Sequence, residues 1–90
     1  LPTPEAVQQI FRIHTAGMTL GADVDFPALV TRLKAISGAD IQAICTEAGM
    51  RAIRLEHEAI AQEDFLAAVK KHEKGELHTG HGIAPSALYA

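Results

Sequence analysis

Apolar residues recur at three- and four-residue spacing near the start of the chain, which predicts an amphipathic helix there. Thr3-Pro4-Glu5 supplies a capping hydroxyl, a proline suited to the first turn and an acid suited to the positive end of the helix dipole. Gly17 and Gly21 mark its end. The apolar stripe contains Val7, Ile10, Phe11, His14 and Met18.

A second helix is predicted after Asp23 or Asp25, since either acid can cap it. Pro27 fits only within the first turn of a helix, which places the start close to these acids. The side chains expected to face inward are Phe26, Leu29, Val30, Leu33 and Ile36.

The third helix has the clearest local signal, because Ser37 and Asp40 stand at the spacing of a capping box. The small pair Ala48-Gly49 allows another helix to approach closely, although glycine lowers helix propensity by about 1 kcal/mol. The expected inner face contains Ile41, Ile44, Cys45, Ala48, Ala52, Ile53 and Leu55.

The fourth helix is predicted from Ile60 and Phe65, which are five residues apart, as in a hydrophobic staple across a helix start. Ala61, at the cap position, offers no side-chain acceptor. Three lysines suit the negative end of this helix, and Gly75 is expected to end it. The inner face continues through Leu66, Ala68, Val69 and His72.

Residues 76–90 lack helical periodicity and contain Gly80, Gly82 and Pro85, so they are expected to form a flexible tail. The tail closes with Leu88-Tyr89-Ala90, which offers an apolar side chain, an amphipathic ring and a carboxylate. These three groups can dock together as one peptide. The expected organisation is an all-α four-helix bundle over residues 1–75, followed by a tail over residues 76–90.

Composition agrees with one small helical domain. The 90 residues are 48% hydrophobic but only 4% aromatic, and the formal net charge is −3. This charge argues against a nucleic-acid partner held through phosphates. No apolar stretch approaches the roughly 20 residues that span a membrane, so we expect a cytoplasmic protein with no membrane partner. The single Cys45 excludes an internal disulfide and is expected to be buried.

Several motifs in order resemble the C-terminal lid subdomain of AAA+ ATPases, especially the proteasomal branch of proteasome-activating nucleotidases and regulatory-particle ATPases. The motifs are Ile10-Phe11-Arg12-Ile13-His14-Thr15, residues 37–41, residues 43–50, Ala52-Ile53-Arg54 and Asp64-Phe65. The similarity covers roughly residues 1–72 in order and spacing. The terminal hydrophobic-Tyr-any-residue sequence is the one that this branch uses to dock on the proteasome core.

The resemblance implies a nucleotide site, in which Ile10 packs on adenine and His14 bonds the base or ribose. It also places Gly38 and Ala39 against the adenine. Without it, His14 is an ordinary half-buried residue and Gly38-Ala39 an ordinary helix start. Other AAA+ branches carry an arginine on this helix, but Ala39 has no guanidinium, so no catalytic residue is assigned. Arg51 and Arg54 are expected to be surface or subunit-interface charges.

The chain contains no Gly-x-x-x-x-Gly-Lys-Ser/Thr loop, so we expect no ATP hydrolysis by these 90 residues alone. ATP or ADP is expected only in the longer subunit, of which this chain looks like a fragment. No metal site is expected, because His72, His78 and His81 cross from a helix end into a tail without thiolates. Glu56, Glu58 and Glu63 are expected to form a solvated face.

The resemblance therefore implies a lid that closes the ATP site of a homo- or hetero-hexameric ring. Its tail would dock on the α-ring of the proteasome core and open the gate for protein unfolding and degradation. Two alternatives remain: the lid of another AAA+ unfoldase, or a helical interaction module unrelated to ATP.

Overall fold

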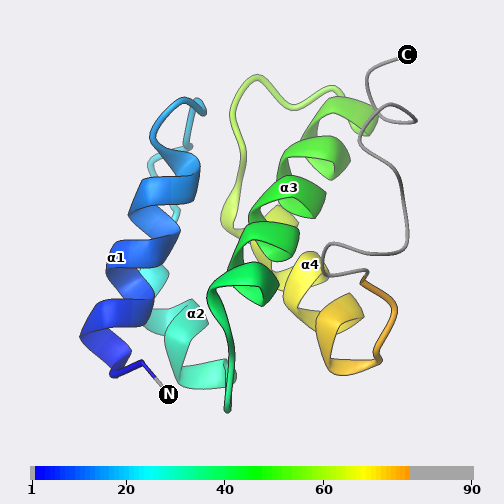
Figure 1. Cartoon of the computed structure of the whole chain (residues 1–90). Helices are drawn as coiled ribbons and strands as arrows, with labels where there is room; N and C mark the ends of the chain where they lie inside the picture. Colours follow the sequence, from blue (N-terminus) through cyan, green and yellow to red (C-terminus); the bar gives the residue numbers. More distant parts are fainter. Residues whose placement is uncertain (1, 78–90) are drawn as a thin grey trace.

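The computed structural model describes residues 2–77, which form four helices and no strand (Figure 1). The helices are α1 (Pro4–Thr15), α2 (Phe26–Arg32), α3 (Gly38–Arg54) and α4 (Gln62–Glu73). The all-α prediction is confirmed. None of the helices in this range is long and apolar enough to cross a membrane. Leu88, Tyr89 and Ala90 lie outside the described residues.

The longest helix, α3, lies between α1 and α4 and packs against both (Figure 1). The short α2 packs against α1 and α4, which closes the bundle on the side away from α3. All three phenylalanines of the chain meet where α1, α2 and α4 converge. The rings of Phe11 and Phe26 stack with centroids 5.3 Å apart, and Phe65 meets each of them edge-on.

Three helix starts are capped as the sequence predicts. The side-chain oxygens of Thr3 and Asp25 accept hydrogen bonds from amides three residues later, at 3.1 and 3.0 Å. Asp25 rather than Asp23 is therefore the cap of α2. Ser37 and Asp40 form the predicted capping box, with each side chain bonded to the other's amide. Ala61 caps α4 without a side-chain bond, also as expected.

The inner face of α3 is predicted correctly over most of its length and wrongly at its end. Ile41, Ile44, Cys45, Ala48 and Ala52 are all buried, whereas Ile53 is 77% exposed and Leu55 is 50% exposed. Successive residues of a helix point about 100° apart, so Ile53 turns away from the core when Ala52 faces it. The prediction for Leu55 is wrong for another reason, because this residue lies just beyond the last turn of α3.

The two longer connections are joined to each other. Leu20 and Ile60 form an isolated β-bridge, in which Gly21 donates to the Ile60 carbonyl and the Ile60 amide donates to Thr19, both at 2.9 Å. A Cβ at Gly21 would lie 3.2 Å from that same Ile60 carbonyl, so a larger residue would push the connections apart. The bridge thus fastens the α1–α2 connection to the start of α4.

Gly75 ends α4, as predicted, in a left-handed conformation with a φ of 72°. Its amide donates to the carbonyl of His72, and the amide of Glu76 donates to the carbonyl of Lys71. These two bonds make a Schellman motif, which satisfies carbonyls that the helix end leaves open. Leu77, two residues past the boundary expected from the sequence, packs against the core.

Two isoleucines on α3 give a matched test of the inner face. We expect Ile44→Ala to lower the free energy of unfolding by about 2–5 kcal/mol, because it leaves a cavity in a fully buried site. Ile53→Ala should change it by less than about 0.5 kcal/mol, because that side chain is exposed. Denaturant unfolding followed by circular dichroism measures both, and similar losses would contradict this assignment of the core.

Candidate functional site

The first pair of predicted site residues stands on α1. Ile10 and His14 are four residues apart, so both project from one side of the helix. Both side chains are partly buried, and Ile10 packs against the edge of the core. The neighbouring Phe11 and Thr15 are buried and fix the rotation of α1, which leaves Ile10 and His14 at the border of the core.

The second pair, Gly38 and Ala39, forms the first turn of α3, where the Ser37–Asp40 capping box fixes the backbone. Ala39 is exposed, and a Cβ added at Gly38 would meet no atom within 4 Å. Nothing in the described part of the chain therefore requires glycine at position 38. In Figure 1, α3 begins level with the middle of α1, against which it packs. The two predicted pairs thus stand on neighbouring helices.

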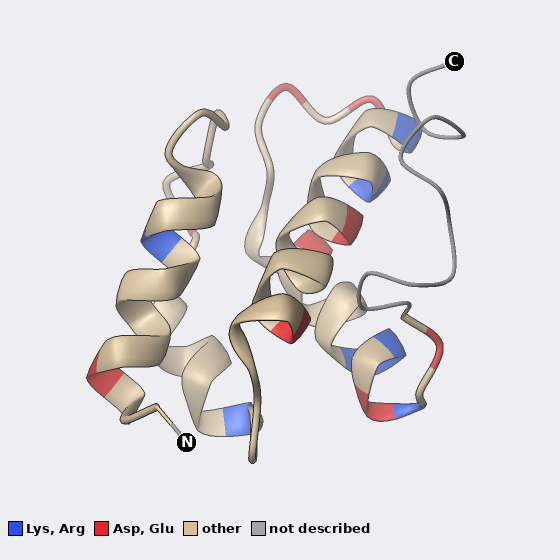
Figure 2. Cartoon of the chain, viewed as in Figure 1, with Lys and Arg blue, Asp and Glu red and all other residues tan. Residues whose placement is uncertain are grey.

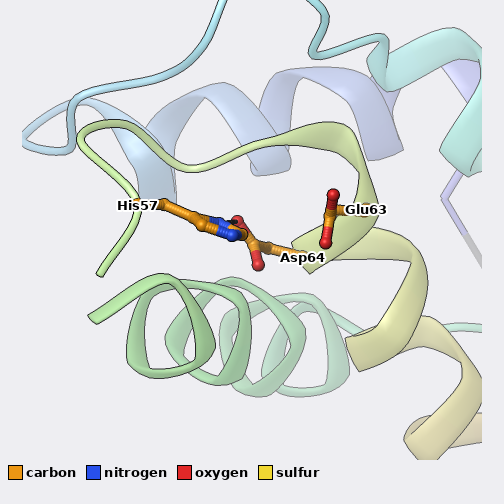
Figure 3. Close-up of side chains that lie close together, drawn as sticks. All are labelled: His57, Glu63 and Asp64. Atoms are coloured by element: carbon orange, nitrogen blue, oxygen red, sulfur yellow. Dashed lines mark hydrogen bonds and ion pairs between the residues drawn. The ribbon is translucent and has the colours of Figure 1, made fainter. Parts of the chain in front are cut away.

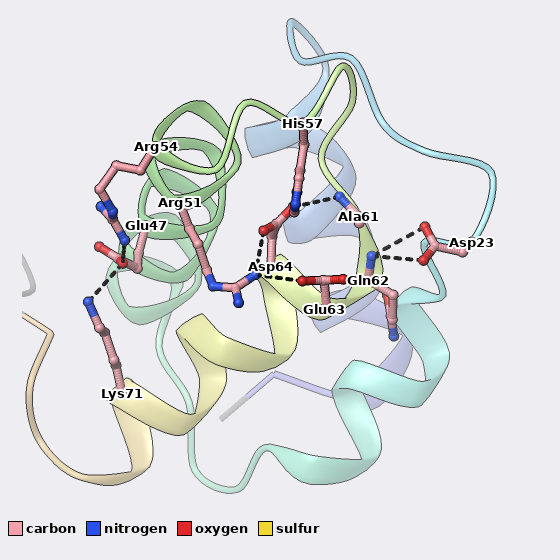
Figure 4. A network of polar contacts seen from close by, with 10 residues as sticks. All are labelled: Asp23, Glu47, Arg51, Arg54, His57, Ala61, Gln62, Glu63, Asp64 and Lys71. Carbon is pink, nitrogen blue, oxygen red and sulfur yellow. Dashed lines mark hydrogen bonds and ion pairs between the residues drawn. The ribbon is translucent and has the colours of Figure 1, made fainter.

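A buried carboxylate to which the sequence analysis assigned no role lies at the start of α4. The side chain of Asp64 is completely buried and has three partners: the Arg51 guanidinium at 2.6 Å, the His57 ring at 2.9 Å and the Ala61 amide at 2.8 Å (Figure 4). The sequence did contain a signal for this role, because Asp64 stands three residues after the cap of α4, where the acid of a capping box is found.

Burial by itself raises the pKa of Asp64, but the Ala61 amide, the His57 ring and the Arg51 guanidinium outweigh it. The pKa of this carboxyl is therefore held below its ordinary value, and the group is ionised at neutral pH. Arg51 was expected to be a surface or interface charge. Instead, it forms ion pairs inside the chain, with Asp64 and with the exposed Glu63.

A second buried carboxylate, Glu47, joins α3 to the C-terminal part of α4. It is 8% exposed and accepts hydrogen bonds from Lys71 at 2.9 Å and from Arg54 at 3.1 Å (Figure 4). Burial opposes ionisation, yet the two cations hold the pKa of Glu47 below its ordinary value. Arg54 is half exposed, in keeping with the surface position expected for it.

His57, Glu63 and Asp64 are the one group in residues 2–77 whose ligand atoms gather closely enough to hold a metal ion, all within 4.8 Å of one another (Figure 3). The Arg51 guanidinium contacts both carboxylates of this group. A metal ion would have to share the site with that fixed positive charge. The arrangement is therefore suited to ion pairing within the chain.

A shallow groove of about 470 Å³ lies along the α1–α2 connection. The Arg12 guanidinium lies over the Phe26 ring at its edge, 5.8 Å from the ring centre. None of the four predicted nucleotide-contacting residues lines this groove. Its floor and walls are formed by Leu20, Gly21, Ala22, Asp23, Val24, Asp25, Phe26 and Pro27, together with Arg12.

The described residues form a small bundle of four helices, in which the capped third helix buries one face against the first and fourth. The family model of the AAA+ lid domain matches residues 23–67, and the chain belongs to this family.

Within this family, the chain is similar to proteasomal ATPases. It is 48% identical to a proteasome-activating nucleotidase of Methanopyrus kandleri over 86% of the chain, and 54% identical to that of Archaeoglobus fulgidus over 79%. It is 39% identical to a probable 26S proteasome regulatory subunit 4 of Caenorhabditis elegans over 99% of the chain. The chain spans about a fifth of the length of these relatives, between 18% and 19%.

The depressed pKa of Asp64 predicts a pH dependence of stability. The stabilisation that the ionised Asp64 contributes is fully present above the ordinary carboxyl pKa of about 4. It is lost as the pH falls through the lower pKa that Asp64 has in the folded chain. Acid titration of the unfolding free energy should therefore show a steeper fall in the wild-type chain than in Asp64→Asn. Glu58→Gln, which changes an exposed carboxylate on the connection that precedes α4, is the control and should follow the wild type. Equal slopes for wild type and Asp64→Asn would contradict the assignment.

Proposed function

We propose that this chain is the lid of a proteasome-activating AAA+ ATPase, which closes the nucleotide site of its subunit and docks the ring on the proteasome core. The observation that carries the proposal is the agreement of two separate features. The lid region is similar to proteasome-activating nucleotidases, and the chain also contains the terminal Leu88-Tyr89-Ala90 sequence.

At the nucleotide, Ile10 packs on the adenine and His14 bonds the base or the ribose. Gly38 and Ala39 let the backbone at the start of α3 come close to the ring, because neither carries a long side chain. A Cβ at position 38 would meet no atom of the described chain, so the fold itself does not require glycine there. This supports a role for Gly38 in contact with the nucleotide. ATP and ADP contact these residues differently, and this difference biases the angle of the lid.

At the proteasome core, the tail enters a pocket between adjacent subunits of the α-ring. Leu88 fills an apolar slot, Tyr89 wedges its ring, and the carboxylate of Ala90 pairs with a lysine of the pocket. A hexameric ring presents six such tails, so each tail needs only modest affinity for the whole ring to stay bound.

His14→Ala in the full-length subunit is expected to weaken nucleotide binding by about 1–2 kcal/mol, because one hydrogen bond and some packing are lost. Titration with a fluorescent nucleotide measures the change. The matched control is His57→Ala, which removes a histidine that pairs with Asp64 and should leave nucleotide affinity unchanged in rings that still assemble. Unaltered affinity in His14→Ala would remove this residue from the site.

Tyr89→Ala in the full-length ring is expected to abolish stimulation of peptide hydrolysis by the proteasome core, because the ring that wedges into the pocket is gone. Deletion of Ala90 should act in the same way, since it shifts the carboxylate out of register. Adding one residue after Ala90 should also abolish stimulation, because the anchor moves by about 3.5 Å.

ATP hydrolysis by these three variants is the internal control and should match the wild-type rate, because none of them changes a residue proposed to contact the nucleotide. Full stimulation by Tyr89→Ala would contradict the docking role and leave an AAA+ lid without an assigned partner.

A further inference from the structure

Lys71 holds two separate parts of the chain at once. Its side-chain ammonium donates to the buried Glu47 of α3 at 2.9 Å (Figure 4). Its backbone carbonyl accepts the amide of Glu76, also at 2.9 Å, in the turn where the chain leaves α4. One residue therefore links the middle of α3 to this exit turn, which comprises residues 74–77.

The exit turn has a defined geometry. Gly75 adopts the left-handed conformation that the Schellman motif needs, and Leu77 packs against the core immediately afterwards. Residues 78–90 follow directly. The exit turn is therefore the last described segment before residues 78–90, and its position sets where they begin on the lid.

Breaking the Lys71–Glu47 pair is expected to cost more than breaking a typical surface ion pair, because the Glu47 side chain is only 10% exposed although that of Lys71 is 44% exposed. Glu47 is 8% exposed, so removal of its cation would leave a largely buried carboxylate with only the half-exposed Arg54 beside it. The opposite end of α4 is fastened separately, because Asp64 pairs with Arg51 of α3. Each end of α4 thus has its own ionic connection to α3, and Lys71 provides the one next to the exit turn.

We propose that Lys71 is a positioning residue, whose ion pair with Glu47 fixes the exit turn relative to α3 and so sets the place on the lid from which residues 78–90 begin. The functional consequence rests on the proposed function. Several tails on one ring engage their sites together only when each starts in a direction that reaches its own site, because effective concentration falls when the geometry is wrong.

The position of the exit turn can be measured in the 90-residue chain. Spin labels on Thr46→Cys of α3 and Glu76→Cys of the exit turn, both exposed positions, give a distance distribution by electron–electron double resonance. The native Cys45 is buried, and burial raises the pKa of its thiol to about 12, so it should remain unlabelled.

We expect a narrow distribution in the wild type and a clearly broader one in Lys71→Met, which keeps an unbranched side chain but removes the charge. Lys70→Met is the matched control, because Lys70 is exposed and has no ion pair among the described residues. It should stay narrow, as should the conservative Lys71→Arg. If circular dichroism shows Lys71→Met to be unfolded, Glu47→Gln removes the same pair and should broaden the distribution instead.

The functional arm uses the full-length ring. Lys71→Met should reduce ATP-dependent stimulation of the proteasome core several-fold, while its ATPase rate stays at that of Lys70→Met. A synthetic peptide of residues 80–90, which contains no lid, reports separately on whether the tail itself acts on the core.

The outcomes separate the two proposals. An unchanged distribution in the folded variant overturns the positioning role, whatever the tail does. A broad distribution with full stimulation overturns its functional consequence. A ring with native Lys71 whose stimulation survives Tyr89→Ala overturns the docking proposal instead, and the distance measurement then still decides the role of Lys71 in the lid.

Discussion

The burial of one face of α3 against both α1 and α4 is the constraint on which the rest of the described structure depends. The small residues Ala48 and Ala52 on this face are almost completely buried, as is Ile44, so the neighbouring helices can pack closely against α3. This packing sets where α1 presents Ile10 and His14 relative to the start of α3. It also brings α4 alongside α3, where ionic contacts hold both ends of α4.

Ionic contacts between α3 and α4 are made to two carboxylates that are buried when the helices pack, Asp64 and Glu47. Asp64 and Glu47 would each be unfavourable in the interior alone, and each accepts a hydrogen bond from a cation on the other helix, Arg51 of α3 for Asp64 and Lys71 of α4 for Glu47. The β-bridge between Leu20 and Ile60 adds a backbone link between the two longer connections. Together these contacts connect α4 and the exit turn to α3. The first turn of α3 holds two of the proposed nucleotide contacts, Gly38 and Ala39.

Most of the fold could be predicted because its signals are local. The capping box at Ser37–Asp40, the glycine at 75 and the apolar stripes depend on neighbours within a few residues. Ile53 and Leu55 were assigned wrongly because apolar character does not reveal which side of a helix end is covered. The partners of Asp64 and Glu47 could not be predicted, since which cation meets a carboxylate depends on how α3 and α4 cross. The nucleotide-contacting residues came from a family resemblance, because a histidine on an apolar stripe and a small first turn of a helix do not by themselves specify a ligand.

We propose that this lid belongs to a ring that docks on the proteasome through Leu88-Tyr89-Ala90. The most direct measurement is an electron cryomicroscopy structure of the full-length ring bound to the proteasome core in the presence of ATP. The expected result is Leu88-Tyr89-Ala90 seated between adjacent subunits of the α-ring, with nucleotide beside Ile10 and His14. A complex in which these residues lie outside the interface, or in which nucleotide is remote from α1, would contradict the claim.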